Sequence, residues 1–492
     1  MKRNIIIGCI AAALGLSACD NYLDLVPKGE FVLNQTSDYL GLIEDVYGYP
    51  IQSEWYLCGE ATSHNMELLE NYSAPLNSAA FYWDEEFDRA AYMIATGSDD
   101  MYTMCYKKIS NFNIIIQNIN DSEGSEEDKR YGMAQAKIMR AYAYFYLINT
   151  FAKPYNPATA EQDRGIILRE DFDMEAKGVQ STVADAYRLI QRDIEEALPH
   201  LPHVAMNTFR PDKSFGYALK AKVHLFKREF DEALQASLDG IKEAEGEGRH
   251  RLWNMNTEYQ AAVGYMLQLY PMYTEEMIEY GMPMYSMFRM FTSMMYFNHP
   301  YEDAENLLSQ NGLTQFDPSP NMVRKPVMDL YEPKEDLRYT FNLGATPTRP
   351  TAEPGSIMLS LSAGYHWNPA GIKLSEVYLM AAECYARRND KENAMKYVNE
   401  VRKNRIIAKY YAALTAADDA DAMRIVREER KRELLFTSNG FFDMRRFCTE
   451  FNETLTREIG GETYTLQPGS HLLTFPFPVS AMQNSNLIQN SK

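Results

Sequence analysis

The chain has 492 residues, 46% of them hydrophobic, so it is long enough for one large core or for two lobes. Its formal net charge is −19 at pH 7, which argues against nucleic-acid binding, because that function uses clustered Lys and Arg side chains over phosphates. The 6 cysteines show no C-x-x-C pair or metal-ligand spacing, and the 8 histidines are scattered. The sequence therefore predicts no nucleic-acid partner, no metal site and no cofactor.

The first elements in chain order are those of an export signal. A basic start (Lys2 and Arg3) precedes an apolar stretch over 5–16, which is too short to cross a bilayer, since a spanning helix needs ~20 apolar residues. The stretch ends in LSAC, whose last residue is Cys19, and this resembles the bacterial lipobox. We expect residues 1–18 to be a signal peptide and Cys19 to carry several acyl chains, which together make a stable anchor. An ordinary secretory signal with an incidental cysteine is the alternative.

No later window offers a second span. The richest apolar stretch, 265–297, contains three glutamates, an arginine and two prolines. We therefore expect a body that its lipid holds at a membrane surface. Export permits disulfides, but nothing in the spacing of the cysteines requires one. A buried free thiol is the expected state for at least Cys384, which lies on an apolar helical face.

Helical spacing of apolar residues begins after the first hundred residues. It predicts helices over 101–119 and 131–151, the second followed shortly by two prolines that stop it. Ser181 or Thr182 can cap a third helix, which ends at Pro199.

Two helical hairpins follow a common rule. Ala221 and Ala233 are twelve residues apart, with a turn between them, and so are Ala382 and Ala394. Small residues at such places allow antiparallel helices to approach closely. This spacing resembles the tetratricopeptide pattern, but two hairpins are too few for a free-standing solenoid, which needs three or more repeats. We expect them to form a scaffold on which the rest of the chain packs.

Between the hairpins, roughly over 245–371, prolines and glycines become frequent and few periodic helices are visible. The stretch 265–297 is dense in Met, Tyr and Phe, a combination suited to holding a ligand. The alternative is that this stretch folds over the scaffold and buries those side chains.

The C-terminal part carries the most specific motifs. The stretches IVREERKRELLFTSNGFFDMRRF (425–447) and FPFPVSAMQNSNLIQN (475–490) resemble the two end motifs of the SusD/RagB family of outer-membrane nutrient-binding lipoproteins. The matching residues are Glu429, Arg430, Glu433, Leu434, Phe436, Gly440, Asp443, Arg445, Arg446, Phe447, Pro476, Pro478, Asn486, Gln489 and Asn490. Phe442 stands where the family often has arginine, and Met444 replaces leucine.

Two earlier stretches extend this resemblance. AQAKIMRAYAYFYLINTF, at 134–151, is similar to an Ala-rich helix of the family, and MDLYEPKEDLRYTF, at 328–341, to its L-Y-x-x-x-D-x-R segment. The resemblance thus covers nearly the whole chain in order, and it is weakest over 53–97.

The resemblance implies a mostly helical fold in which four tetratricopeptide-like helix pairs carry a loop-rich side with the ligand site. It implies one domain over 19–492, with a scaffold mainly at 101–245 and 371–447, a binding side mainly at 53–97 and 246–370, and a C-terminal fastening segment at 448–492. It also implies a partner, a TonB-dependent outer-membrane barrel of the SusC type. The pair would import glycans or, in some branches of the family, peptides.

A charged cluster in the C-terminal motifs invites comparison with an active site. It consists of Glu428, Glu429, Glu433, Asp443, Arg445 and Arg446. Paired carboxylates can act as acid and base when their environments push their pKa values apart. Here each carboxylate has several basic residues close in sequence, which favours structural ion pairs, and no hydrolase or phosphate-binding motif is present. We expect a scaffold and not an enzyme.

Glycan binding needs flat aromatic faces against sugar rings, with polar side chains beside them for the hydroxyl groups. Two stretches, 63–87 and 282–300, offer this composition. The candidate ligand-binding residues are Tyr72, Tyr82, Trp83, Tyr285, Arg289 and Tyr296, followed by Trp55 and Trp367. Loop packing is the alternative for each of them.

The leading hypothesis is a surface lipoprotein that binds a glycan and delivers it to a SusC-type transporter. A peptide-binding importer subunit of the RagB kind, a periplasmic tetratricopeptide scaffold and an enzyme are the alternatives, in that order.

Overall fold

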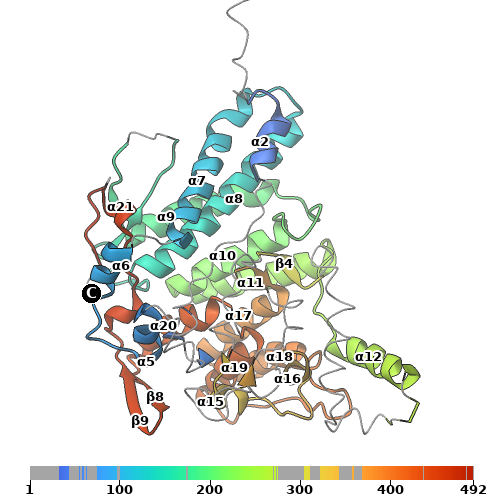
Figure 1. Ribbon diagram of the computed structural model, residues 1–492. Coiled ribbons are helices and arrows are strands. Elements are labelled where there is room, and N and C mark those ends of the chain that lie inside the picture. The colour runs from blue at the N-terminus through green and yellow to red at the C-terminus, as the bar shows by residue number, and fades with distance from the viewer. Residues whose placement is uncertain are drawn as a thin grey trace, which may run out of the picture.

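The computed structural model describes part of the chain. The described residues are 33–43, 55, 58–59, 62–63, 75–96, 100–172, 176–269, 271–272, 274, 304–310, 322–342, 357–358, 368, 370–435, 437–483 and 485–490. They are mostly helical, as the sequence predicts, with a few short strands (Figure 1). None of the helices in these ranges is long and apolar enough to cross a membrane.

The first long helices are α7 (Asp100–Asn118) and α8 (Glu126–Phe151), which pack against each other and against the short helix α2 (Thr36–Ile43). Both predicted helices are confirmed, but α8 begins before the predicted start. Ser125 caps it by accepting a hydrogen bond from the Asp128 backbone. Three acidic residues fill the first turn, where their negative charges interact favourably with the positive end of the helix dipole. That first turn is polar, so apolar spacing alone does not reveal it.

The third predicted helix is α9 (Val183–Ala197), preceded by the antiparallel strands β2 (Arg164–Ile167) and β3 (Gln180–Thr182). Thr182 is the cap. Its hydroxyl accepts from the Asp185 backbone at 3.0 Å, and the Asp185 carboxylate accepts from the Thr182 backbone at 3.2 Å, which completes a capping box.

Both predicted hairpins are present. The first is α10 (Lys213–Lys227) with α11 (Phe230–Gly246), and the second is α17 (Leu374–Arg387) with α18 (Lys391–Arg402). The four alanines that predicted them, Ala221, Ala233, Ala382 and Ala394, are fully buried.

The turns of the two hairpins use the same backbone device. Arg228 and Asn389 adopt left-handed conformations, with φ of +66° and +60°. This conformation reverses the chain within two or three residues, so each second helix folds back directly onto the first.

The helices stack one upon another along the molecule (Figure 1). Helix α11 packs on α17, and α17 packs on α19 (Asp419–Glu433), so the two hairpins become one continuous scaffold. Helix α8 lies in the core: nearly every side chain from Ala134 to Phe151 is buried, which explains its continuous run of alanines and aromatics.

The remaining elements of the described residues surround this scaffold, and most of them are short. The other helices are α5 (Pro75–Tyr82), α6 (Arg89–Thr96), α12 (Met255–Leu269), α15 (Lys325–Met328), α16 (Leu337–Asn342), α20 (Asn439–Phe451), α21 (Val479–Gln483) and the 3-10 turns η2 (Ile119–Asp121), η3 (Leu198–His200) and η5 (His471–Leu473). The other strands are β1 (Thr62–Ser63), β4 (Asn306–Leu308), β5 (Met322–Val323), β6 (Ile357–Met358), β7 (Ile372–Lys373), β8 (Leu455–Ile459) and β9 (Glu462–Leu466).

The pairings between the named strands of the described residues are antiparallel: β5 lies between β1 and β6, β4 pairs with β7, and β8 pairs with β9. The β8–β9 hairpin projects from the lower left of the molecule beside α5 (Figure 1). The cysteines at 58, 105, 384 and 448 are buried free thiols, as expected for Cys384.

Candidate functional site

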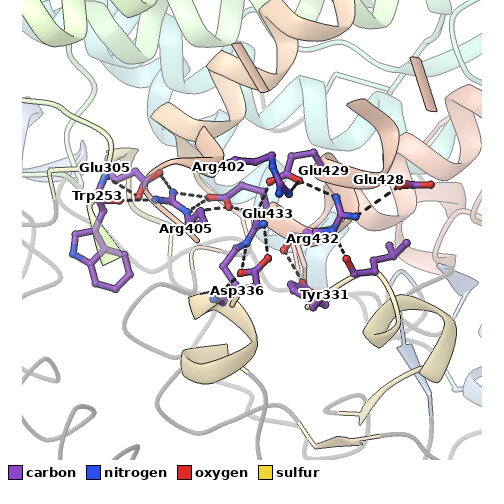
Figure 2. A network of polar contacts seen from close by, with 12 residues as sticks. Trp253, Glu305, Tyr331, Asp336, Arg402, Arg405, Glu428, Glu429, Arg432 and Glu433 are labelled. Carbon is purple, nitrogen blue, oxygen red and sulfur yellow. Dashed lines mark hydrogen bonds and ion pairs between the residues drawn. The ribbon is translucent and has the colours of Figure 1, made fainter. Parts of the chain in front are cut away.

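Two members of the charged cluster, Glu429 and Glu433, lie in a buried network of ion pairs (Figure 2). At its centre, the Arg338 guanidinium contacts Asp336 at 2.8 Å, Glu429 at 2.7 Å and Glu433 at 2.9 Å. The L-Y-x-x-x-D-x-R segment at 328–341 and the motif at 425–447, which are far apart in sequence, thus contact each other through this arginine. Burial alone would raise the pKa of Glu429 and Glu433, but Arg338 with Arg432 and Arg405 holds both below their usual range.

Arg405 extends this network toward the irregular middle of the chain. Its guanidinium contacts Glu433 at 2.7 Å and Glu305 at 2.5 Å, and it donates to the Trp253 carbonyl at 2.5 Å. Figure 2 shows Arg405 between Glu305 and Glu433. Arg405 therefore attaches the segment 304–310 to the scaffold, because it pairs both with Glu305 of that segment and with Glu433 of α19.

A second ion-pair cluster joins α17 to α20. Both carboxylate oxygens of Glu383 accept from Arg446 at 2.6 Å, and one also accepts from Arg387 at 2.9 Å. Asp443 contacts Arg430 and Arg446, each at 2.8 Å. Arg446, the second of the two adjacent arginines in the motif at 425–447, thus fastens α20 to the second hairpin.

The first of these two arginines has another role. Arg445 is fully buried and donates to the carbonyl oxygens of Asn149 and Ala152, at the C-terminal end of α8. A cation is favoured there because the last carbonyls of a helix carry its negative partial charge. Burial lowers the pKa of the Arg445 guanidinium to about 10.

These environments favour scaffolding over catalysis. A general acid near neutral pH needs a raised pKa, whereas arginines hold the pKa values of Glu383, Glu429, Glu433 and Asp443 low. Carboxylates bound in this way stay ionised and stay in place. The sequence predicted this scaffold role.

The predicted ligand-binding residues are only partly described. Tyr72, Tyr285, Arg289, Tyr296 and Trp367 lie outside the described residues, as does the lipidation candidate Cys19. Their roles stay predictions. Tyr82, Trp83 and Trp55 are described, and they differ from one another in exposure.

For the two tryptophans the structure favours the packing alternative. Trp83 is 3% exposed, donates from its indole N–H to the Cys58 carbonyl at 2.8 Å, and lies 4.2 Å from the Arg457 guanidinium. Trp55 is 0% exposed and packs against Tyr146 and Phe442.

Tyr82 is the described candidate that reaches the surface. It is partly buried, and its ring centroid lies 5.2 Å from that of Tyr464 on β9, with the two planes inclined by 47°. Tyr464 was not among the residues predicted from sequence. The alternating strands around Gly460 and Gly461 signal a hairpin, but no local pattern shows which helix that hairpin touches.

Comparison with known proteins shows which family models and relatives this chain resembles. Residues 22–225 match a family model described as "Starch-binding associating with outer membrane", and residues 364–472 match the model of the SusD family. A SusD-like protein of Formosa agariphila is 24% identical over 383 residues, which cover 71% of this chain and 70% of that protein.

Solved structures share the fold over nearly the whole chain. A SusD superfamily protein from Bacteroides thetaiotaomicron has a TM-score of 0.68 at 18% identity, covering 93% of this chain and 100% of the other. A laminarin-binding SusD-like protein has a TM-score of 0.58 at 14% identity, covering 93% and 99%. The two family models together cover more than half of the sequence, and the second includes Glu429, Glu433, Asp443, Arg445 and Arg446. The chain belongs to the SusD/RagB family.

Proposed function

We propose that this protein is a cell-surface lipoprotein that binds a glycan and delivers it to a SusC-type TonB-dependent transporter. The observation that carries the proposal is the family motif at 425–447. Its Glu429 and Glu433 are bound by Arg338 in the buried network that fastens the loop-rich side to the helical scaffold. The starch-binding description of the family model and the laminarin-binding structural relative favour a glycan as the ligand class.

Ligand binding is tested directly by a panel of polysaccharides and peptides. Affinity electrophoresis and titration calorimetry of the mature chain should show saturable retention of at least one glycan. Retention of peptides alone would replace the proposed ligand class with that of a peptide importer. Retention of neither would contradict the binding role.

The transporter partnership needs a separate test. A tagged chain, purified from detergent-solubilised outer membranes, should bring down a large barrel protein. Recovery without any barrel would contradict delivery to a transporter and favour a scaffold protein.

The lipid anchor is tested at Cys19. In the proposed location, Cys19→Ala abolishes incorporation of labelled palmitate and releases the protein from the membrane. Protease added to intact cells should digest the unmodified protein, because an outward-facing body is accessible. Protection from the protease would place the protein in the periplasm.

The proposal also includes the absence of catalysis. No glycan of the panel should be hydrolysed, because the clustered carboxylates are held ionised by arginines. If the unmodified protein hydrolyses a glycan and a correctly folded Glu429→Gln variant does not, the cluster is an active site instead.

A further inference from the structure

The C-terminal β-hairpin presents one cross-strand pair toward α5. In the β8–β9 register, Arg457 lies directly opposite Tyr464. Directly opposed residues of an antiparallel pair place their side chains on the same face. The strands are joined by Gly460 and Gly461, whose φ values of +62° and +87° suit a tight hairpin turn. The hairpin therefore directs a cation and an aromatic ring to one place.

The Arg457 side chain connects two separate stretches of the N-terminal part. It is 1% exposed and donates to the carbonyl of Phe81, at the end of α5, and to that of Gly59 at 2.7 Å. Its guanidinium also lies 4.2 Å from the ring of Trp83. A planar guanidinium can make all these contacts at once, because its donors form a rigid fork and its face stacks on aromatic rings. Lysine offers only a point charge on a flexible stem.

The backbone that Arg457 holds is strained. Trp83, the residue after α5, has a φ of +51°, a left-handed conformation that is rare for a bulky side chain. Its indole N–H donates to the Cys58 carbonyl, and the face of the indole ring contacts Arg457. Such strain persists only where the surroundings fix it. Here it turns the chain directly after Tyr82.

The ring of Tyr82 meets that of Tyr464 at the surface. Both side chains are partly exposed, and their planes are inclined by 47°. The Tyr464 hydroxyl donates to the Glu462 carboxylate at 2.9 Å, and this contact raises the pKa of Tyr464. Two aromatic faces thus lie beside a carboxylate that can accept from sugar hydroxyl groups.

We propose that Tyr464 and Tyr82 form a binding platform for sugar rings, and that Arg457 is the residue that positions it. The inference rests on the proposed glycan-binding function and adds to it a location and two residues. The platform joins the first predicted binding stretch to the C-terminal fastening segment. The hairpin thereby contributes to recognition as well as to folding.

The test compares two variants with two matched controls. Tyr464→Ala removes one ring, and its control is Tyr397→Ala, another partly exposed tyrosine with an aromatic partner at 5.4 Å. Arg457→Lys removes the fork, and its control is Arg140→Lys, a buried arginine on α8 that contacts Asp193 and Asn113. The probes are laminarin and soluble starch, measured by calorimetry on the folded fraction of each variant.

We expect Tyr464→Ala to raise the Kd of the bound glycan about tenfold, a typical loss for a central aromatic contact. Arg457→Lys should raise it similarly and should speed amide exchange over 75–96, while both controls stay within about twofold of the unmodified Kd. If the unmodified protein binds and Tyr464→Ala binds equally well, the platform is refuted while the proposed function stands. If the unmodified protein binds neither probe nor any other glycan of the panel, both fail together. Because Tyr464 is not a core residue, this result does not depend on whether Arg457→Lys folds.

Discussion

The substitution Glu383→Gln tests whether the arginine clusters hold the fold together. Glu383 is 0% exposed, and it accepts two hydrogen bonds from Arg446 and one from Arg387. Glutamine keeps the shape but removes the negative charge and turns an N–H₂ group toward a guanidinium. Breaking a buried ion pair from one side costs ~3–5 kcal/mol, because the remaining charges stay buried without compensation. We expect a loss of that size in the free energy of unfolding.

The assay is urea unfolding at pH 7, followed by circular dichroism and read as a shift in the midpoint at constant slope. The matched control is Glu161→Gln. Glu161 also pairs with an arginine, Arg188, at 2.7 Å, but it is 59% exposed, so the expected loss is below ~1 kcal/mol. A loss below ~1 kcal/mol for Glu383→Gln as well would refute the claim that the arginine clusters hold the fold together.

The difference in stability between the unmodified protein and Glu383→Gln should depend on pH with a defined sign. Burial would raise the pKa of Glu383, but Arg446 and Arg387 hold it far below its usual range. A carboxyl whose pKa is lowered by folding stabilises the protein above its unfolded pKa, which is about 4.3 for glutamate, and loses this effect as the pH falls toward the folded value. The difference between the unmodified protein and Glu383→Gln should therefore be largest above about pH 5 and should shrink steadily below it.

Three smaller predictions address the local signals of the fold. Thr182→Ala should lower the free energy of unfolding by ~1 kcal/mol, because it removes the cap of α9. Urea titration measures this loss, with Thr456→Ala at an exposed position as the control. Ala233→Leu should cost ~1–3 kcal/mol in the same titration, since a larger side chain overpacks the contact between α10 and α11. Gly461→Ala should lower stability by ~1 kcal/mol, because φ is +87° there, whereas Gly469→Ala, with open space around its Cβ, should not.

The parts of the fold that could be predicted are those that local chemistry specifies. The helix cap at Thr182 and the paired alanines of the two hairpins depend on neighbours within about a dozen residues, and the structure confirms them. The first turn of α8 escaped prediction because it is held by Ser125 and by acidic side chains instead of apolar spacing. The role of the charged cluster was predicted from its own basic neighbours. Its main partner, Arg338, was not, because that contact depends on how distant segments pack.

Arg457 shows why the candidate site was harder to predict than the scaffold. A buried arginine paired with carboxylates leaves a signature in the sequence, since acidic and basic residues recur at helical spacing, as they do around Glu429. Arg457 contacts backbone carbonyls and the rings of Phe81 and Trp83, groups that every sequence contains and no pattern marks. The aromatic richness of 63–87 therefore predicted that ligand-binding rings lie in this stretch, but not which ones face outward. The strained turn at Trp83 separates them: it buries Trp83 against Arg457 and leaves Tyr82 beside the hairpin, where a partner from the far end of the chain completes the surface.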